Sequence, residues 1–223
     1  MMKRLRAAMF DLDGTLADTL ADIAACGNAA LEALGRSPLP VTRYRYLAGQ
    51  GARALVRDAL GVPEDDPRIE QGLRYFLERQ LAHGMDRTKP YPGVPEMLDE
   101  MTRRGWRLAV LSNKPHAATV AMIERLFARW RFDAVRGQRD GGPLKPDPAQ
   151  ALEIAGELGI PPDEWMYLGD TRVDMLTARA AGMWAVGALW GFRDAEELKA
   201  AGADALLVHP RELWRWVDGE PSS

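Results

Sequence analysis

Residues 5–16 read LRAAMFDLDGTL, a short apolar run that ends in two aspartates and a glycine. Such a run, bounded by turn residues, is typical of a buried strand. Residues two apart on an extended backbone point the same way, so Asp11 and Asp13 present two carboxylates to one site. Their repulsion favours a bound cation, and Mg²⁺ prefers oxygen ligands. Gly14 permits a sharp turn beside that site; the alternative is a strand that simply ends in a polar turn.

Beyond this stretch, short apolar runs alternate with amphipathic stretches of helical length. The alternation predicts an α/β fold with a doubly wound, mainly parallel Rossmann-like sheet, in which ligands bind at the carboxyl ends of the strands. The expected strands are Leu5–Phe10, Leu108–Ser112, Phe132–Gly137, Met166–Gly169, Trp184–Leu189 and Ala205–Val208. The expected helices around them are Val94–Arg104, His116–Ala128, Pro148–Leu158, Met175–Ala181, Ala195–Ala201 and Pro210–Val217.

One long segment, residues 17–86, interrupts the alternation and carries no strand pattern. Its helical patterns are Leu20–Leu34, Ala52–Leu60 and Ile69–His83. We therefore predict an all-helical domain of residues 17–86, inserted into an α/β core domain of residues 1–16 and 87–223. The proline- and glycine-rich residues 86–95 are the expected return linker.

Polar residues also follow three other predicted strands. Ser112 and Asn113 offer a hydroxyl and an amide that can bind phosphoryl oxygens. Lys145, between prolines, can neutralise a carboxylate or a phosphoryl group. If a helix follows Asp170, then Asp174 lies one turn further on the same side, where both can face a cation.

Each of these features alone has an ordinary structural explanation. They could be a turn before a proline, a solvated lysine, a helix N-cap and a first-turn carboxylate. Their joint occurrence at four strand ends favours a site that binds both phosphate and a divalent cation.

The overall composition excludes several classes of protein. The chain has 223 residues, 47% of them hydrophobic and 27% charged, as expected for a folded globular protein. The formal net charge of -3 does not indicate the excess of Lys and Arg that proteins use to bind nucleic acid. One cysteine cannot form an internal disulfide, and neither a signal peptide nor a membrane-spanning run is evident. We expect a cytoplasmic monomer or homodimer that acts on a small phosphorylated metabolite.

The four motifs together resemble the haloacid dehalogenase-like superfamily, whose phosphatases carry DxDGT, then Ser or Thr, then Lys, then GD(S/T)xxD. The matching residues are Asp11, Asp13, Thr15, Ser112, Lys145, Asp170 and Asp174. The resemblance covers the whole chain, because the helical insertion is similar to the family's α-helical cap. SNKP at 112–115 and GQGA at 49–52 resemble phosphoglycolate phosphatase-like members. Thr171 replaces the Ser of many relatives, and Val173 stands where those phosphatases often have Asn.

The chemistry of these residues, with the resemblance, assigns a role to each. Asp11 is the expected nucleophile, Asp13 the general acid and base, and Lys145 balances charge during the transfer. The expected ligands of Mg²⁺ are Asp11 and Asp170, with the backbone carbonyl of Asp13 added by the resemblance. Asp174 either binds the metal directly or orients the groups around it. The expected phosphate-binding residues are Thr15, which would also fix the loop by a local hydrogen bond, Ser112 and Asn113.

The inserted helices are expected to read the substrate. The candidates are Gly49, Gln50, Gly51 and Arg53, whose glycines permit close backbone approach to a ligand, although a glycine-rich turn before a helix is equally open. Arg43, Arg45 or Arg53 can pair with a substrate carboxylate, or can be solvated helix positions. The expected substrate is a small phosphate monoester, possibly 2-phosphoglycolate.

Several other functions remain open at this point. A sugar-phosphate phosphatase shares all of these features. A β-phosphoglucomutase-like phosphotransferase also shares them, but such mutases typically carry Val at the position of Thr15. A receiver-like phospho-accepting module is about half this length and lacks a helical insertion. A non-catalytic binding relative would be expected to lose one of Asp11, Asp13, Lys145 or Asp170.

Overall fold

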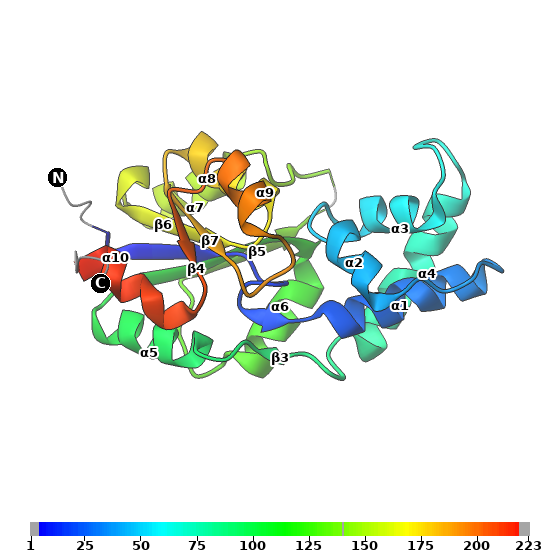
Figure 1. The fold of residues 1–223 in the computed structure, drawn as a ribbon, viewed down its shortest axis with the longest axis horizontal. Helices are drawn as coiled ribbons and strands as arrows, with labels where there is room; N and C mark the ends of the chain where they lie inside the picture. The colour runs from blue at the N-terminus through cyan, green and yellow to red at the C-terminus, as the bar shows by residue number, and fades with distance from the viewer. Residues whose placement is uncertain (1–4, 140, 219–223) are drawn as a thin grey trace.

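The computed structural model of the protein describes residues 5–139 and 141–218. Six parallel strands form one sheet in the order β5-β4-β1-β6-β7-β8 (Figure 1). Their bounds are β1 Ala7–Phe10, β4 Arg107–Pro115, β5 Ala134–Gln138, β6 Trp165–Gly169, β7 Trp184–Ala188 and β8 Ala205–Leu207. The predicted α/β class and the six strands are confirmed, with ends that differ by a few residues.

Strands β1, β6, β7 and β8 are apolar because helices cover both faces of the sheet. In β1, Ala8 and Phe10 belong to one hydrophobic cluster, and Ala7 and Met9 belong to the other. The first cluster includes helices α5 Val94–Arg103, α6 His116–Leu126 and α10 Leu213–Asp218. The second includes α7 Ala149–Glu157, α8 Arg172–Ala181 and α9 Ala195–Ala200. The doubly wound arrangement is therefore observed directly.

The position of β1 in the sheet determines where the site lies. The chain runs from β1 outward to β4 and β5, then crosses over and runs outward again through β6, β7 and β8. The direction of winding thus reverses at β1, which lies between β4 and β6. In such sheets this reversal leaves a crevice at the carboxyl ends of the strands. Two of the four predicted motifs follow β1 and β6, and a third forms the carboxyl end of β4.

Four helices leave the sheet after β1 and pack together at the end of the molecule opposite the two labelled termini (Figure 1). They are α1 Leu20–Ala33, α2 Val41–Leu47, α3 Ala52–Leu60 and α4 Arg68–His83, and we refer to them as the cap. The cap has its own hydrophobic cluster, which includes Ile23, Tyr44, Leu55 and Phe76.

Two features of this region depart from the sequence expectations. Helix α2 was not expected, because Val41–Leu47 is short and follows a proline-rich stretch. Residues 17–86 are also not entirely helical, since β2 Ala17–Asp18 pairs antiparallel with β3 Lys89–Pro90. Two-residue strands are too short to produce a sequence period. This pairing ties together the outgoing and returning chain segments at the base of the cap.

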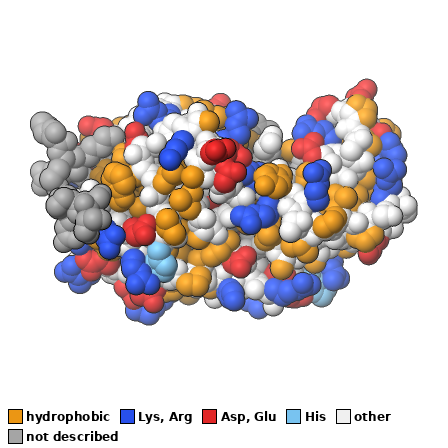
Figure 2. Space-filling model, viewed as in Figure 1, with side chains coloured by type: hydrophobic (Ala, Val, Ile, Leu, Met, Phe, Trp, Pro, Cys, Tyr) orange, Lys and Arg blue, Asp and Glu red, His pale blue; other side chains and the backbone are white. Residues whose placement is uncertain are grey.

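The surface carries no single dominant charge on the face drawn in Figure 2, where lysines and arginines alternate with acidic side chains. Among the described helices, none is long and apolar enough to cross a membrane.

Candidate active site

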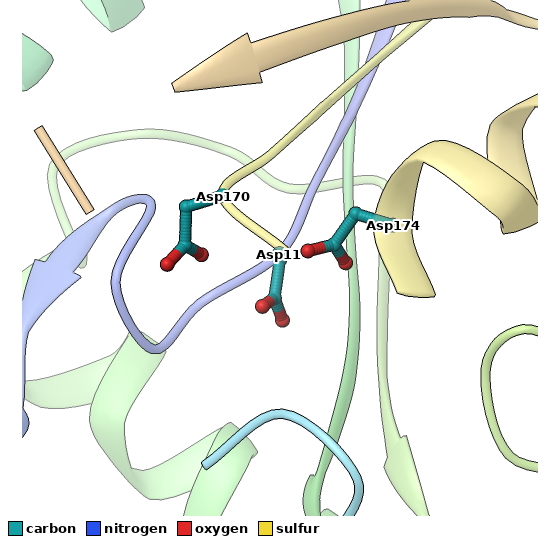
Figure 3. A group of neighbouring side chains, drawn as sticks. All are labelled: Asp11, Asp170 and Asp174. Atoms are coloured by element: carbon teal, nitrogen blue, oxygen red, sulfur yellow. The ribbon is translucent and has the colours of Figure 1, made fainter. Parts of the chain in front are cut away.

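Three buried aspartates meet at the carboxyl edge of the sheet. Asp11 follows β1, Asp170 follows β6, and Asp174 lies in the first turn of α8. Figure 3 shows their carboxylates clustered around a common space. One oxygen from each lies within 4.8 Å of the others. The structure therefore brings together three residues that the sequence placed in separate motifs.

The charge balance of this group suits a divalent cation. Burial raises the pKa of Asp11 to about 6, although the nearby ammonium of Lys145 opposes the shift. Burial and the charges of Asp174 and Asp11 raise the pKa of Asp170 well above its usual range. Three carboxylates and one ammonium, from Lys145, leave a formal charge of −2. Oδ1 of Asp11 lies 2.9 Å from Nζ of Lys145 and accepts no hydrogen bond from any other described residue. An all-oxygen, doubly negative group of this kind fits Mg²⁺.

Two hydrogen bonds and two closely packed glycines hold the side chain of Asp170 in place. Its Oδ1 accepts a hydrogen bond from Oγ1 of Thr15 at 2.8 Å, and its Oδ2 accepts one from the backbone N–H of Phe192 at 2.7 Å. Gly14 has φ +85°, and a Cβ there would lie 2.2 Å from Oδ2 of Asp170. A Cβ on Gly191 would lie 2.3 Å from Cβ of Asp170. The hydroxyl of Thr15 thus orients Asp170, and its expected contact with phosphate stays a prediction.

Asp174 occupies the first turn of α8 through a capping box. Its Oδ2 accepts hydrogen bonds from the backbone N–H and from Oγ1 of Thr171, at 2.9 and 2.7 Å. Thr171, rather than Asp170, is the N-cap residue, so the helix begins at Arg172 instead of the expected Met175. The capping box uses only Oδ2, so Oδ1 of Asp174 faces the carboxylate group, where it accepts a hydrogen bond from Nζ of Lys145.

Lys145 links two of the three carboxylates. Its Nζ lies 2.9 Å from Oδ1 of Asp11 and 2.6 Å from Oδ1 of Asp174. Burial opposes the positive charge, but these carboxylates outweigh it and hold the pKa of Lys145 well above its usual range. Lys145 is therefore a permanent cation beside Asp11.

Asn113 fixes the backbone that carries Lys145. Its Oδ1 accepts a hydrogen bond from the N–H of Lys145 at 2.9 Å, and its Nδ2 donates to the carbonyl of Lys145 at 3.0 Å. The same Nδ2 donates to the carbonyl of Gly49 in the cap, also at 3.0 Å. Both amide protons are then in use. The side chain of Asn113 is therefore occupied by Lys145 and Gly49, and the binding of phosphate by Ser112 and by the backbone around Asn113 stays a prediction.

Asp13 stands apart from the three-carboxylate group. Its carboxylate pairs with Nζ of Lys114, at 3.1 and 3.2 Å, and Asp13 lines the same pocket as Asp11. Its side chain therefore does not join the metal group, and only its backbone carbonyl remains as the predicted ligand. The sequence reading missed Lys114, although one signal was present. Lys114 lies two residues after Ser112 on an extended strand, so both side chains point the same way.

The pocket lies between the carboxyl edge of the sheet and the cap. Its core wall includes Asp11, Asp13, Ser112 and Lys114. Its cap wall is formed by residues of α1, α3 and α4 and by the turn before α3, which are Ile23, Ala48, Gly49, Gly51, Ala52, Leu55, Phe76 and Gln80.

Two of the predicted cap residues lie elsewhere. Gln50 is exposed and lines a separate cleft beside Thr171. Arg53 points outward to ion pairs with Glu64 and Glu70 on the cap surface, because α3 places it on the face opposite the pocket. Arg43 is also exposed. None of these three side chains lines the pocket that contains Asp11.

Arg45 joins the cap to the core. It donates to the carbonyls of Gly191 and Phe192, at 2.7 and 3.2 Å. In return, Arg193 donates to the carbonyl of Ala48 at 3.0 Å. The ring of Phe192 is buried in the hydrophobic cluster of the cap, while its backbone N–H binds Asp170. We call residues 190–193 the bridging loop, since it contacts the cap and the carboxylate group together.

The fold and these carboxylates define a known class of enzyme. A model of the haloacid dehalogenase-like hydrolase family matches residues 8–188. The chain belongs to this family, as its motifs indicated.

Curated relatives and solved structures agree with that assignment. The chain is 35% identical to N-acetylmuramic acid 6-phosphate phosphatase of Pseudomonas aeruginosa, over 94% of this chain and 93% of the relative. It is also 35% identical to phosphoglycolate phosphatase of Chromobacterium violaceum, over 96% of each chain. A solved structure from Lactobacillus delbrueckii subsp. bulgaricus, described as a candidate phosphoglycolate phosphatase, superposes with a TM-score of 0.89 at 30% identity, covering 97% of this chain and 99% of that one.

Proposed function

We propose that this protein is a Mg²⁺-dependent phosphatase that hydrolyses a small phosphate monoester through an aspartyl-phosphate on Asp11. One observation carries the proposal. Asp11 belongs to the cation-binding carboxylate group and contacts Lys145, while Asp13, in a separate ion pair, lines the same pocket. A nucleophile and a proton donor are thereby kept chemically distinct within one site.

The first half-reaction uses both aspartates. A carboxylate oxygen of Asp11 forms a bond to phosphorus as the bond to the leaving oxygen breaks, and Asp13 gives its proton to that oxygen. Mg²⁺ bound by Asp11, Asp170 and Asp174 would offset the negative charge of the phosphoryl group. Lys145 and the hydroxyl of Ser112 would stabilise the same charge.

The second half-reaction restores the enzyme. Asp13, now ionised, takes a proton from water, whose oxygen forms a bond to phosphorus as the bond to Asp11 breaks. The products are inorganic phosphate and the free carboxylate of Asp11. The ammonium of Lys114 lies 3.1 Å from the carboxylate of Asp13 and would hold it in place while it accepts the proton.

The names of the relatives support 2-phosphoglycolate as the leading substrate, with a sugar phosphate as the second candidate. In this proposal residues 17–86 form the cap domain that reads the substrate, and residues 1–16 and 87–223 form the catalytic domain. The protein would act in the cytoplasm as a monomer or homodimer.

Removing the cation is expected to abolish hydrolysis of 4-nitrophenyl phosphate. This aryl ester needs little specific recognition by cap residues. Activity should disappear after exhaustive treatment with chelator and return when MgCl₂ is added back in excess. Full activity after chelation would contradict the proposed mechanism, whatever the natural substrate is.

The affinity for Mg²⁺ is expected to fall as the pH drops below about 6. Burial raises the pKa of Asp11 to about 6, and a proton on that carboxylate competes with the cation. The apparent Kd should rise by roughly tenfold per pH unit below the pKa of Asp11, and protonation of Asp170, whose pKa is also raised, should add to this loss. Calorimetric titration with MgCl₂ between about pH 7.5 and about pH 5, without substrate, measures the effect. A constant Kd over this range would contradict cation binding by Asp11.

A further inference from the structure

Four aspartates lie at the active-site edge of the sheet, but the structure divides them into two groups. Three form the carboxylate group described above, and the fourth, Asp13, pairs with Lys114 instead. Burial is the largest cause of the raised pKa of Asp11, and the charge of Asp13 adds to the rise. Asp13 is therefore close enough for its charge to act on Asp11. A divalent cation in the carboxylate group would attract this fourth carboxylate unless another positive charge held it.

Lys114 holds Asp13 by both of its carboxylate oxygens. The Nζ atom of Lys114 lies 3.1 Å from Oδ1 and 3.2 Å from Oδ2 of Asp13. The side chain of Lys114 is only 3% exposed, compared with 17% for that of Asp13. A buried ammonium is unfavourable unless it is paired with an opposite charge. Lys114 therefore has little freedom to leave this carboxylate.

The backbone around Lys114 is fixed as well. Strands β1 and β4 are neighbours in the sheet, so Asp13, just beyond β1, lies beside the carboxyl end of β4, which contains Lys114. The backbone N–H of Lys114 donates to Oγ of Ser112 at 3.3 Å, and its carbonyl accepts from Oγ1 of the buried Thr119 at 3.3 Å. The position of the ammonium is thus set by the core domain itself.

The proposed mechanism gives a chemical reason for this arrangement. A carboxylate that binds a cation is a poor proton donor and acceptor, because the cation competes with the proton for the same oxygens. Asp11 binds the cation, whereas Asp13 has to exchange a proton with the leaving group and with water. The two aspartates are only two residues apart, so something has to separate their carboxylates.

We propose that Lys114 is a positioning residue that keeps the carboxylate of Asp13 out of the cation site and available for proton transfer. This inference rests on the proposed phosphatase function and goes beyond it, because it gives Lys114 control over which aspartates bind the metal. Without the ammonium, the carboxylate of Asp13 would turn toward the cation. The site would then gain a fourth carboxylate ligand and lose its proton donor, so both metal preference and turnover should change.

The metal preference of Lys114→Met tests the proposal without any turnover. Ca²⁺ takes more oxygen ligands than Mg²⁺, which keeps several of its waters. A fourth carboxylate ligand should therefore lower the Kd for Ca²⁺ by about tenfold relative to the Kd for Mg²⁺, as measured by calorimetric titration with each ion. Loss of a nearby positive charge alone would lower both Kd values by the same factor. That result, or unchanged Kd values, would overturn the proposal.

The control for this variant is Lys199→Met, which removes an ammonium from an exposed position on α9. It should leave both Kd values and turnover unchanged. Thermal unfolding of each variant shows whether it is folded under the conditions of the titration.

Two aryl esters of similar shape test the effect on proton transfer. Phenol is a poorer leaving group than 4-nitrophenol and depends more on a proton donor. Lys114→Met should therefore slow the hydrolysis of phenyl phosphate by about 10- to 100-fold more than that of 4-nitrophenyl phosphate, mainly in kcat. Equal losses with the two esters would overturn the proposal, because they would show that Lys114 does not act through the proton donor.

A double variant keeps the test decisive if Lys114→Met is unstable. Asp13→Asn/Lys114→Met leaves neither charge of the pair behind. If Lys114 acts only through Asp13, the double variant should hydrolyse phenyl phosphate as fast as Asp13→Asn and should keep the wild-type preference between Ca²⁺ and Mg²⁺. A double variant that is slower than Asp13→Asn would overturn the proposal. Absence of aryl phosphate hydrolysis by the wild-type protein would instead overturn the phosphatase function, while the metal titrations would still test the role of Lys114.

Discussion

Asp11→Asn is expected to reduce phosphatase turnover by about 10⁵-fold or more, as removal of a covalent nucleophile does in other enzymes. The amide cannot form the acyl-phosphate, so covalent labelling of the protein by a phosphorylated substrate should also disappear. The fold should not suffer. Burial and two neighbouring carboxylates already raise the pKa of Asp11, so losing its charge relieves repulsion within the group.

The control for this variant is Asp65→Asn, which removes a carboxylate from an exposed position on the cap. Turnover of 4-nitrophenyl phosphate, denaturant unfolding and trapping of the phosphorylated protein by acid quench together separate chemistry from stability. Turnover at the wild-type level in Asp11→Asn would end the assignment of Asp11 as nucleophile.

Asp13→Asn is expected to slow turnover by about 10² to 10⁴-fold, the usual contribution of a positioned proton donor. Its carboxylate does not join the carboxylate group, so the affinity for Mg²⁺ measured by calorimetry should change little. The loss should shrink with leaving groups of low pKa, because these need no proton. A series of aryl phosphates with increasingly acidic phenols measures this dependence, and equal losses across the series would contradict the role of general acid.

The fold could be predicted from the sequence because its strongest signals are local. Apolar runs that end in aspartate, serine or glycine marked the strands, and the helical stretches between them indicated a parallel sheet. The predicted α/β class and the family are confirmed. Helix α2 and the β2–β3 pair were not predicted in this way, because α2 follows a proline-rich stretch and strands of two residues show no period.

The site was predicted less completely, for a physical reason. A sequence indicates which polar residues follow strands, but not how many hydrogen bonds each makes in the folded protein. Thr15 and Asn113 lie beside the carboxylate group, yet their polar atoms are used by Asp170, Lys145 and Gly49. Arg53 was expected to face the substrate, but its side chain points to the cap surface. Which side of a helix faces a pocket depends on how the neighbouring helices pack, and the sequence does not give this packing.

The bridging loop, residues 190–193, has a thermodynamic consequence. It buries Phe192 in the cap, receives hydrogen bonds from Arg45, and donates one N–H to Asp170. Separation of the cap from the core therefore also perturbs a cation ligand. Cap closure and cation binding then share a coupling free energy, which acts equally in both directions. Under the proposed function, a substrate that closes the cap would therefore strengthen Mg²⁺ binding and Mg²⁺ would strengthen substrate binding, and opening of the cap would weaken both.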